Sequence, residues 1–306
     1  MTLPIGQVWG IVVDGVFPGL VSPEWTPVRA AIVWDSRLPR VVLAAVVGAA
    51  LALAGAVAQT ATRNPLADPY LLGVSGGAGL AVVVVTVFGG ALGAVVTPLA
   101  AFVGGLAALA GALAIAGRGG VVGLVLAGVA VGQICWAGTS VVLFLHTRGE
   151  TAKQVLHWLA GGLGDARWSM LWPPLAALVV AGVAALVAGR SLTVLLSGDD
   201  AAAALGVDAR RVRRWALVGV SLVAGTSVAV AGGIGFVGLL VPHAAAALVG
   251  ADPRRLLPTS ALLGALFLVL ADLAARTLPG PGELPVGVVT ALVGGPAFAL
   301  LLARSR

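Results

Sequence analysis

The sequence predicts an all-α polytopic membrane protein. Hydrophobic residues make up 59% of the 306 positions and charged residues only 10%, and the mean hydropathy is +1.08. A water-exposed surface normally carries about a quarter charged residues, so this chain cannot cover one. Apolar stretches of about the 20 residues that cross a bilayer as a helix recur along nearly the whole length. An outer-membrane barrel would instead need strands of about ten residues with alternating apolar and polar side chains, and the sequence has no such alternation.

Nine membrane spans are predicted from the apolar runs that lie between polar breaks. They cover residues 41–61, 71–88, 94–117, 121–145, 171–189, 215–233, 236–249, 258–275 and 285–303. The chain has 44 glycines, and small residues let helices approach closely in lipid, so we expect a tightly packed bundle. The seventh span is short, and Gly235, Gly238 and Pro242 crowd its entrance. We expect a half-length or broken helix there, lining a cavity or buried in protein.

Residues 1–40 are expected to form a periplasmic or interfacial segment. Their best apolar stretch, residues 8–20, is interrupted by Asp14 and Pro18 and is too short to span, so it predicts a surface helix. It has neither the basic start nor the small-residue cleavage site of a signal peptide. Nine spans and an inside C-terminus would put the N-terminus outside. We therefore expect an upstream helix to be missing, through truncation or a misplaced start.

Basic residues predict the orientation. With the C-terminus inside, eleven of the 18 basic residues fall in inside segments, including four arginines within residues 210–214. The outside segments hold the other seven basic residues together with six acidic ones, so that face is nearly neutral. This bias agrees with the positive-inside rule.

Six sequence blocks follow one another along the chain. They are RLPR from Arg37, RNPLADPYLLGVSGGAG from Arg63, LAGVAVG from Leu126, GGIGFVGLLVPH from Gly232, LLPTSALLGALFLVLAD from Leu256 and ELPVGVVTALVGGPAF from Glu283. In this order they resemble the iron-siderophore, haem and cobalamin permease family, the transmembrane subunits of type II ABC importers, over about residues 22–303. Any one block alone would be weak evidence, and it is their order that makes the resemblance specific.

The resemblance implies a ten-helix type II importer bundle, here about nine spans with the first helix missing, as a single transmembrane permease domain over residues 1–306. It implies a bacterial cytoplasmic (inner) membrane, a second permease copy in a homodimer or pseudo-dimer, two ABC ATPase subunits, and a periplasmic or lipid-anchored substrate-binding protein. The cargo would be a metal chelate, with ferric siderophore the first expectation and haem or cobalamin the alternatives. We expect no cofactor, metal site, catalytic residue or nucleic-acid partner.

The chain has no means of using ATP by itself. It lacks the Gly-x4-Gly-Lys-Ser/Thr phosphate loop, and its single lysine, Lys153, falls in an outside segment. The largest inside loop, residues 190–214, is predicted to contain a short helix with Ser197 and Asp199 as candidate N-caps and Gly206 as its stop. In the resembling family this is the coupling helix that docks on the ATPase. The matching residues are Gly198, Asp199, Ala203, Leu205 and Gly206. The alternative is a solvated loop.

Three outside arginines, Arg37, Arg40 and Arg276, match family positions that pair with carboxylates of the binding protein. Arginine suits this contact because its planar guanidinium binds a carboxylate in two places and stays charged. The alternatives are arginines extending to the membrane interface and, for Arg276, an i, i+4 pair with Asp272 on the same helix.

The inner gate of the resembling family corresponds here to two turns. One contains Asn64 and Leu66 and is held extended by the helix-stopping Pro65 and Pro69, and the other contains Val121 and Val122. Apolar side chains suit a constriction that closes by dewetting. Both turns could instead be plain connectors.

The translocation path is expected to include Gln59, Gly235 and Pro242, although an interhelical hydrogen bond is an equal alternative for Gln59. His243 has no ligand partner at metal-binding spacing, and we expect a structural role for it. An ion-coupled carrier is the rival from another class, but such a protein needs an ionisable group deep in the bundle, and only Asp272 lies clearly within a span. A membrane enzyme is disfavoured because no nucleophile with a base and no paired carboxylates are found.

Overall fold

The structure is a computed structural model that describes residues 3–22, 25–89, 96–117, 119–146, 150–278 and 283–304. Regular structure in these residues is entirely helical, which confirms the predicted class. The longer helices are α1 (Ile5–Val16), α3 (Leu38–Thr62), α4 (Val74–Gly89), α5 (Val96–Ala116), α6 (Gly120–His146), α7 (Glu150–Leu159), α8 (Trp172–Val187), α11 (Ala209–Ala231), α12 (Val237–Val249), α13 (Pro253–Thr277) and α14 (Val286–Arg304). The shorter elements are α2 (Pro27–Ala31), the π-helical η1 (Ile32–Arg37), the 3-10 helices η2 (Pro69–Leu72) and η3 (Trp168–Met170), α9 (Gly189–Leu196) and α10 (Asp199–Ala204).

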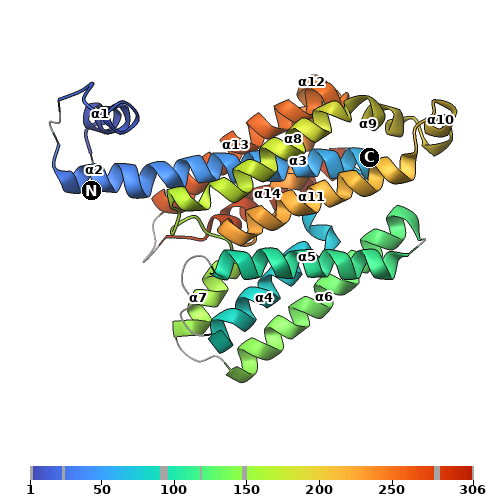
Figure 1. Cartoon of the computed structure of the whole chain (residues 1–306), viewed down its shortest axis with the longest axis horizontal. Helices are drawn as coiled ribbons and strands as arrows, with labels where there is room; N and C mark the ends of the chain where they lie inside the picture. Colours follow the sequence, from blue (N-terminus) through green and yellow to red (C-terminus); the bar gives the residue numbers. More distant parts are fainter. Residues whose placement is uncertain are drawn as a thin grey trace.

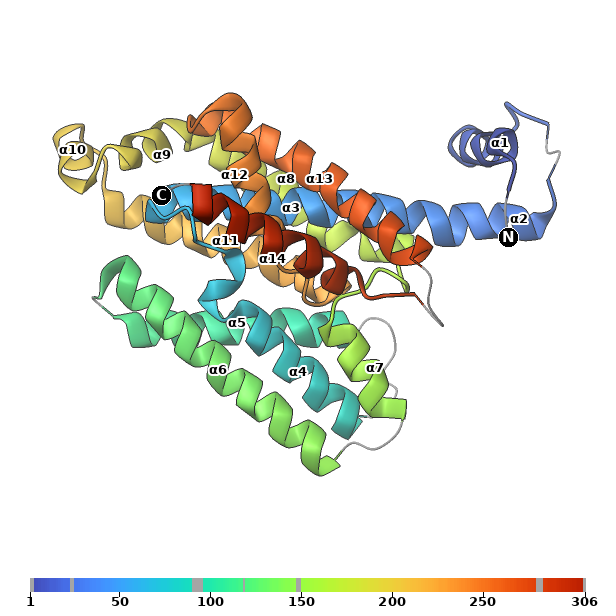
Figure 2. The same cartoon turned by 180° about the vertical axis from the view of Figure 1, so that it is seen from behind.

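Two groups of helices make up the bundle (Figure 1). One group gathers α8, α11, α12 and α13 around α3, and the other consists of α4, α5 and α6 with α7 at one end. Helix α11 joins the two groups because it packs against both α3 and α5. Seen from behind, α14 runs beside α12 and α13 (Figure 2). The α9–α10 segment and α1 lie at opposite ends of the long axis (Figure 1).

Helix α3 is the buried centre of the bundle. Its neighbours approach it closely at two glycines. A Cβ on Gly48 would collide with the backbone of Gly264 on α13, and a Cβ on Gly55 would collide with the backbone of Gly238 on α12. Small residues thus let helix backbones touch, as the glycine-rich composition predicts.

All nine predicted spans coincide with helices. Within the described residues, six helical stretches are long and apolar enough to cross a membrane, and α4, α12 and the apolar part of α14 are shorter. The seventh predicted span is α12, which has 13 residues and follows an irregular segment. Gly232 and Phe236, both with positive φ, separate it from α11, and Pro242 lies inside it. The expectation of a broken, short helix is therefore confirmed.

The first span begins earlier than expected. The prediction starts it at residue 41, whereas a continuous helical stretch runs from Pro27 to Thr62 over 36 residues. Thr26 caps this helix by accepting a hydrogen bond from the Arg29 backbone N–H, and Pro27 occupies its first turn. At 1.5 Å per residue, the helix is about 54 Å long, against about 30 Å of hydrocarbon. Its early turns therefore extend beyond the bilayer core, which is compatible with an interfacial position for residues 1–40.

Candidate functional site

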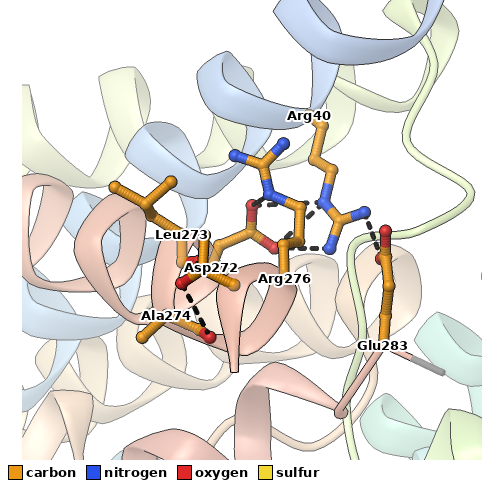
Figure 3. Close-up of polar contacts among 7 residues, drawn as sticks. Arg40, Asp272, Leu273, Ala274, Arg276 and Glu283 are labelled. Carbon is orange, nitrogen blue, oxygen red and sulfur yellow. Dashed lines mark hydrogen bonds and ion pairs between the residues drawn. The ribbon is translucent and has the colours of Figure 1, made fainter. Parts of the chain in front are cut away.

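A cluster of charged side chains joins α3, α13 and the segment before α14 (Figure 3), at the ends of α3 and α13 that lie toward α1 in Figure 1. The Arg40 guanidinium on α3 donates to the Asp272 carboxylate on α13, with Nε–Oδ1 and Nη2–Oδ1 distances of 3.0 and 2.9 Å. Its Nη1 donates to Glu283 Oε2 at 2.6 Å. Arg276 faces the same Asp272 carboxylate, with Nε–Oδ2 at 3.3 Å. One buried carboxylate therefore holds two arginines, and Glu283, just before α14, binds the first of them.

This cluster changes the expectation for Arg40. The docking prediction requires an accessible guanidinium, but Arg40 is 9% exposed and Asp272 only 1% exposed. The carboxylates of Asp272 and Glu283 instead bind the Arg40 guanidinium. Such partners are needed because a buried charged group is tolerated only when its hydrogen bonds are satisfied. The alternative considered for Arg276, an i, i+4 pair with Asp272, is present. Docking by Arg37 and Arg276, which are partly exposed, stays a prediction.

The opposite end carries α10, on the loop predicted to contain a short helix. Gly206 ends it: its φ is +73°, its N–H donates to the Ala203 carbonyl, and the Val207 N–H donates to the Ala202 carbonyl at 2.8 Å. The prediction of Ser197 or Asp199 as the N-cap of α10 is wrong. Gly198 occupies the N-cap position with φ +106°, and no side chain caps the helix.

The tip of α10 is exposed and apolar. Ala203 and Gly206 are exposed, and the Leu205 side chain is 67% exposed. Asp199 fixes the helix to the bundle, since its carboxylate accepts hydrogen bonds from Arg213 at 2.9 Å and from Arg63 at 3.1 Å. The pKa of Asp199 is lowered, chiefly by the hydrogen bond from Arg213. Desolvation opposes this shift, and the positive charges of nearby arginines add to it.

Residues expected at the inner gate lie beside this helix. Helix α3 ends at Thr62, Arg63 takes a left-handed conformation, and the Asn64 carboxamide oxygen accepts the Leu66 backbone N–H at 2.9 Å. Val121 and Val122 lie in the first turn of α6, not in the turn that was expected, because α6 begins at Gly120.

A cleft of about 1140 Å³ brings together residues expected at the inner gate and on the coupling helix. Its walls include Asn64, Val122 and Asp199. Leu66 is 45% exposed but does not line the cleft. Four arginines also line it, namely Arg63, Arg210, Arg213 and Arg214. The sequence predicted that these arginines lie on the same side of the membrane. It did not predict that they line a single cleft.

Two of the three residues expected on the pathway, Gln59 and Pro242, have structural roles in the bundle. Pro242 lacks an N–H, which leaves the Gly238 carbonyl, four residues earlier in α12, without its helical donor. The Gln59 side-chain amide on α3 donates to this carbonyl at 3.3 Å and to the Leu239 carbonyl at 3.1 Å. The interhelical hydrogen bond considered as the alternative for Gln59 is therefore present. Pro242 itself is buried, whereas Gly235 is partly exposed with open space around its Cβ position.

A hollow beside α7 was not expected from the sequence. It has a volume of about 730 Å³ and is lined by charged and aromatic side chains, including Lys153, His157, Trp158, Asp165 and Arg167. The only signal was the density of polar residues between the fourth and fifth predicted spans. His243 is exposed, and within the described ranges no group of three His, Cys, Asp or Glu side chains could hold a metal ion.

Comparisons with known proteins agree with this architecture. The model of the FecCD transport family matches residues 1–304. The chain belongs to the FecCD transport family. Among curated FecCD relatives, it is 41% identical to an uncharacterized ABC transporter permease protein, YvrB, of Bacillus subtilis, over 99% of this chain and 87% of the relative. It is 41% identical to the hemin transport system permease protein HmuU of Yersinia pestis, over 90% of this chain and 84% of the relative.

A solved structure extends the likeness to three dimensions. An inward-facing conformation of a metal-chelate type ABC transporter superimposes with a TM-score of 0.85 and 28% identity, covering 98% of both chains. The resemblance to the permease family of type II importers is thus confirmed, and so is the multi-pass helical membrane fold.

Proposed function

We propose that this chain is the permease subunit of a binding-protein-dependent ABC importer in a bacterial inner membrane. The observation that carries the proposal is the family match over residues 1–304, which includes both ends of the bundle described above. Relatives in this family are named as permeases for hemin, cobalamin and ferric dicitrate. The chain supplies the conduit, two ATPase subunits supply the energy, and a second copy completes the pathway.

The inner end of the bundle supports an ATPase partner. The exposed tip of α10 offers Ala203, Leu205 and Gly206 to a second protein, and Asp199 anchors that helix to the arginines of α3 and α11. A force on α10 would therefore act directly on the wall of the cleft that Asn64 and Val122 share. This arrangement suits the coupling of ATP binding to an inner gate.

The proposed cargo is a metal chelate, with ferric siderophore preferred over haem and cobalamin. Support comes from relatives named for iron(3+)-hydroxamate and ferric dicitrate import. Selection among the three is assigned to the external binding protein, because the pathway residues named above offer few specific polar groups.

Reconstitution tests the proposal. Proteoliposomes would contain this chain, its ATPase and its binding protein, with labelled ferric siderophore outside and ATP in the lumen. We expect uptake that requires luminal ATP and the ATPase and persists with a protonophore. Uptake driven by a proton or sodium gradient without the ATPase would refute the importer proposal in favour of an ion-coupled carrier. ATP-dependent uptake of haem or cobalamin alone would refute only the preferred cargo.

A further inference from the structure

An apolar groove runs between α8 and α11, and one of its ends reaches the basic end of the bundle. We call it the α8–α11 groove, with walls formed by Ala181 and Ala185 of α8 and by Gly219 and Val223 of α11. Leu53 of α3 belongs to its floor. Its volume is about 320 Å³, which falls within the range of small-molecule sites in proteins.

The groove exists because the side chains along it are too short to fill the space between the helices. The α8 wall is built mainly of alanines. On α11, nothing lies within 4 Å of the position that a Cβ on Gly219 would occupy. In water such a gap would be an uncovered apolar surface, but in a bilayer it faces hydrocarbon chains that can enter it. Neighbouring α8 side chains, including Val180 and Val187, are 69% and 81% exposed, so this side of the helix faces outward.

Polar groups lie only at one end of the groove. Arg211 and Trp215, in the first two turns of α11, line that end together with Ser191 of α9. The Trp215 side chain is 65% exposed, and tryptophan at such a position is typical of the membrane–water interface. A Cβ on Gly189 would lie 3.6 Å from the Arg254 side chain, so a second arginine approaches the same end.

The length of the groove matches one leaflet. From Arg211 to Val223 the α11 axis rises about 18 Å at 1.5 Å per residue, and half of the hydrocarbon thickness is about 15 Å. The charged end lies on the basic face of the protein, which the positive-inside rule assigns to the cytoplasm. Lipids of the cytoplasmic leaflet carry negative charge, and basic pockets between helices on that side suit anionic headgroups.

We propose that the α8–α11 groove binds an acyl chain of an anionic phospholipid from the cytoplasmic leaflet, with the lipid phosphate held by Arg211. The occupant is a phospholipid and not a protein helix, because the site is polar at one end and apolar for the depth of a single leaflet. A partner helix that crosses the bilayer would be expected to contact the bundle at all depths. Trp215 marks the depth of the headgroup, and Gly219 provides the room for the chain.

Lipid retention by the full-length chain tests this site directly. The protein is purified from nanodiscs that contain equal amounts of phosphatidylglycerol and phosphatidylcholine, and bound lipid is measured by native mass spectrometry. Three variants are compared with the parent. Arg211→Gln removes the headgroup contact, Gly219→Leu fills the groove, and Arg210→Gln is the matched control because Arg210 lines the inner cleft instead.

We expect the parent and Arg210→Gln to retain phosphatidylglycerol preferentially. Arg211→Gln should lower that preference roughly tenfold, since a hydrogen bond to a charged group contributes on the order of one such factor. Gly219→Leu should lose the bound lipid while its unfolding temperature stays the same or rises, because the new side chain enters open space and leucine favours the helix. An unfolding temperature that is unchanged or higher separates loss of the lipid site from loss of the fold.

Three outcomes would overturn the proposal. One is equal retention of the two lipids by the parent. Another is an equal loss of phosphatidylglycerol in Arg210→Gln and Arg211→Gln, which would indicate a diffuse effect of charge. The third is a stoichiometric protein partner that is released by Gly219→Leu. None of these readouts depends on transport, so the site stands or fails independently of the proposed function.

Discussion

Arg40 and Asp272, 232 residues apart in the chain, form a buried ion pair with two Arg40 nitrogens on one carboxylate. The pair joins α3 to α13, and Glu283 extends it to the start of α14. Desolvation of two charges costs free energy, so the pair is weak evidence for added stability. Removal of either residue, however, would leave the charge of the other buried without its partner.

We expect Arg40→Ala to destabilise the protein by about 3–5 kcal/mol, because it leaves Asp272 buried and short of one cation. The double variant Arg40→Met/Asp272→Leu should recover most of that loss. Thermal unfolding in detergent measures both effects, with the exposed Arg255 changed to alanine as a control. Equal unfolding temperatures for Arg40→Ala and the control would contradict the structural role.

Gln59 is expected to compensate for the missing N–H of Pro242. Gln59→Leu should lower the free energy of unfolding by about 1–3 kcal/mol, because the Gly238 carbonyl loses its side-chain donor. Pro242→Ala restores a backbone N–H for the same carbonyl. In the Pro242→Ala background the Gln59→Leu change should therefore cost less. A double-mutant cycle measures this difference, and the same cost in both backgrounds would exclude the compensation.

The α10 tip is expected to transmit ATP hydrolysis. Ala203→Trp should preserve folding, because Ala203 is exposed, but it should abolish ATP-dependent uptake while ATPase activity persists. Ala203→Ser is the conservative control. Gly206 is a poorer test position, since its φ of +73° strains any residue with a Cβ. Normal uptake by Ala203→Trp in an intact complex would remove α10 from the coupling path.

The Asp199 carboxylate should titrate below its ordinary pKa of 3.8, chiefly because Arg213 donates a hydrogen bond to the charged form. Its contribution to folding is then present above pH 3.8 and is lost as the pH falls through the lowered pKa. Carbon-13 NMR of labelled aspartate carboxyls measures the midpoint. Arg213→Gln should raise it, whereas Arg255→Gln should not. An unchanged midpoint in Arg213→Gln would show that the contact is absent in solution.

Arg37 is expected to contact a carboxylate of the binding protein. Charge reversal in Arg37→Glu should weaken association about tenfold or more at low salt, and the difference should shrink as salt screens the contact. Surface plasmon resonance across a salt series measures this effect. The same change at Arg255, in the first turn of α13 and far from Arg276 in its last turn, should leave the affinity for the binding protein unchanged. Unaltered binding by Arg37→Glu would withdraw Arg37 from the docking surface.

The sequence by itself determined the class, the spans and the break before α12. Length and apolarity of a segment decide whether it can cross a bilayer, and Gly232 and Pro242 disrupt a helix through their own backbone chemistry. The short helix that Gly206 ends was likewise predictable, because its signals are local. The capping by Gly198 was not, since it depends on a φ that the sequence does not reveal.

Only the tertiary structure decided which distant groups meet. Nothing local shows that Arg40 is buried against Asp272 and Glu283, because helix packing, not spacing in the chain, joins these segments. The same holds for Gln59 and the Gly238 carbonyl. The α8–α11 groove depends on where alanines of one helix face a glycine of another, and that relationship exists only once the helices have packed around α3.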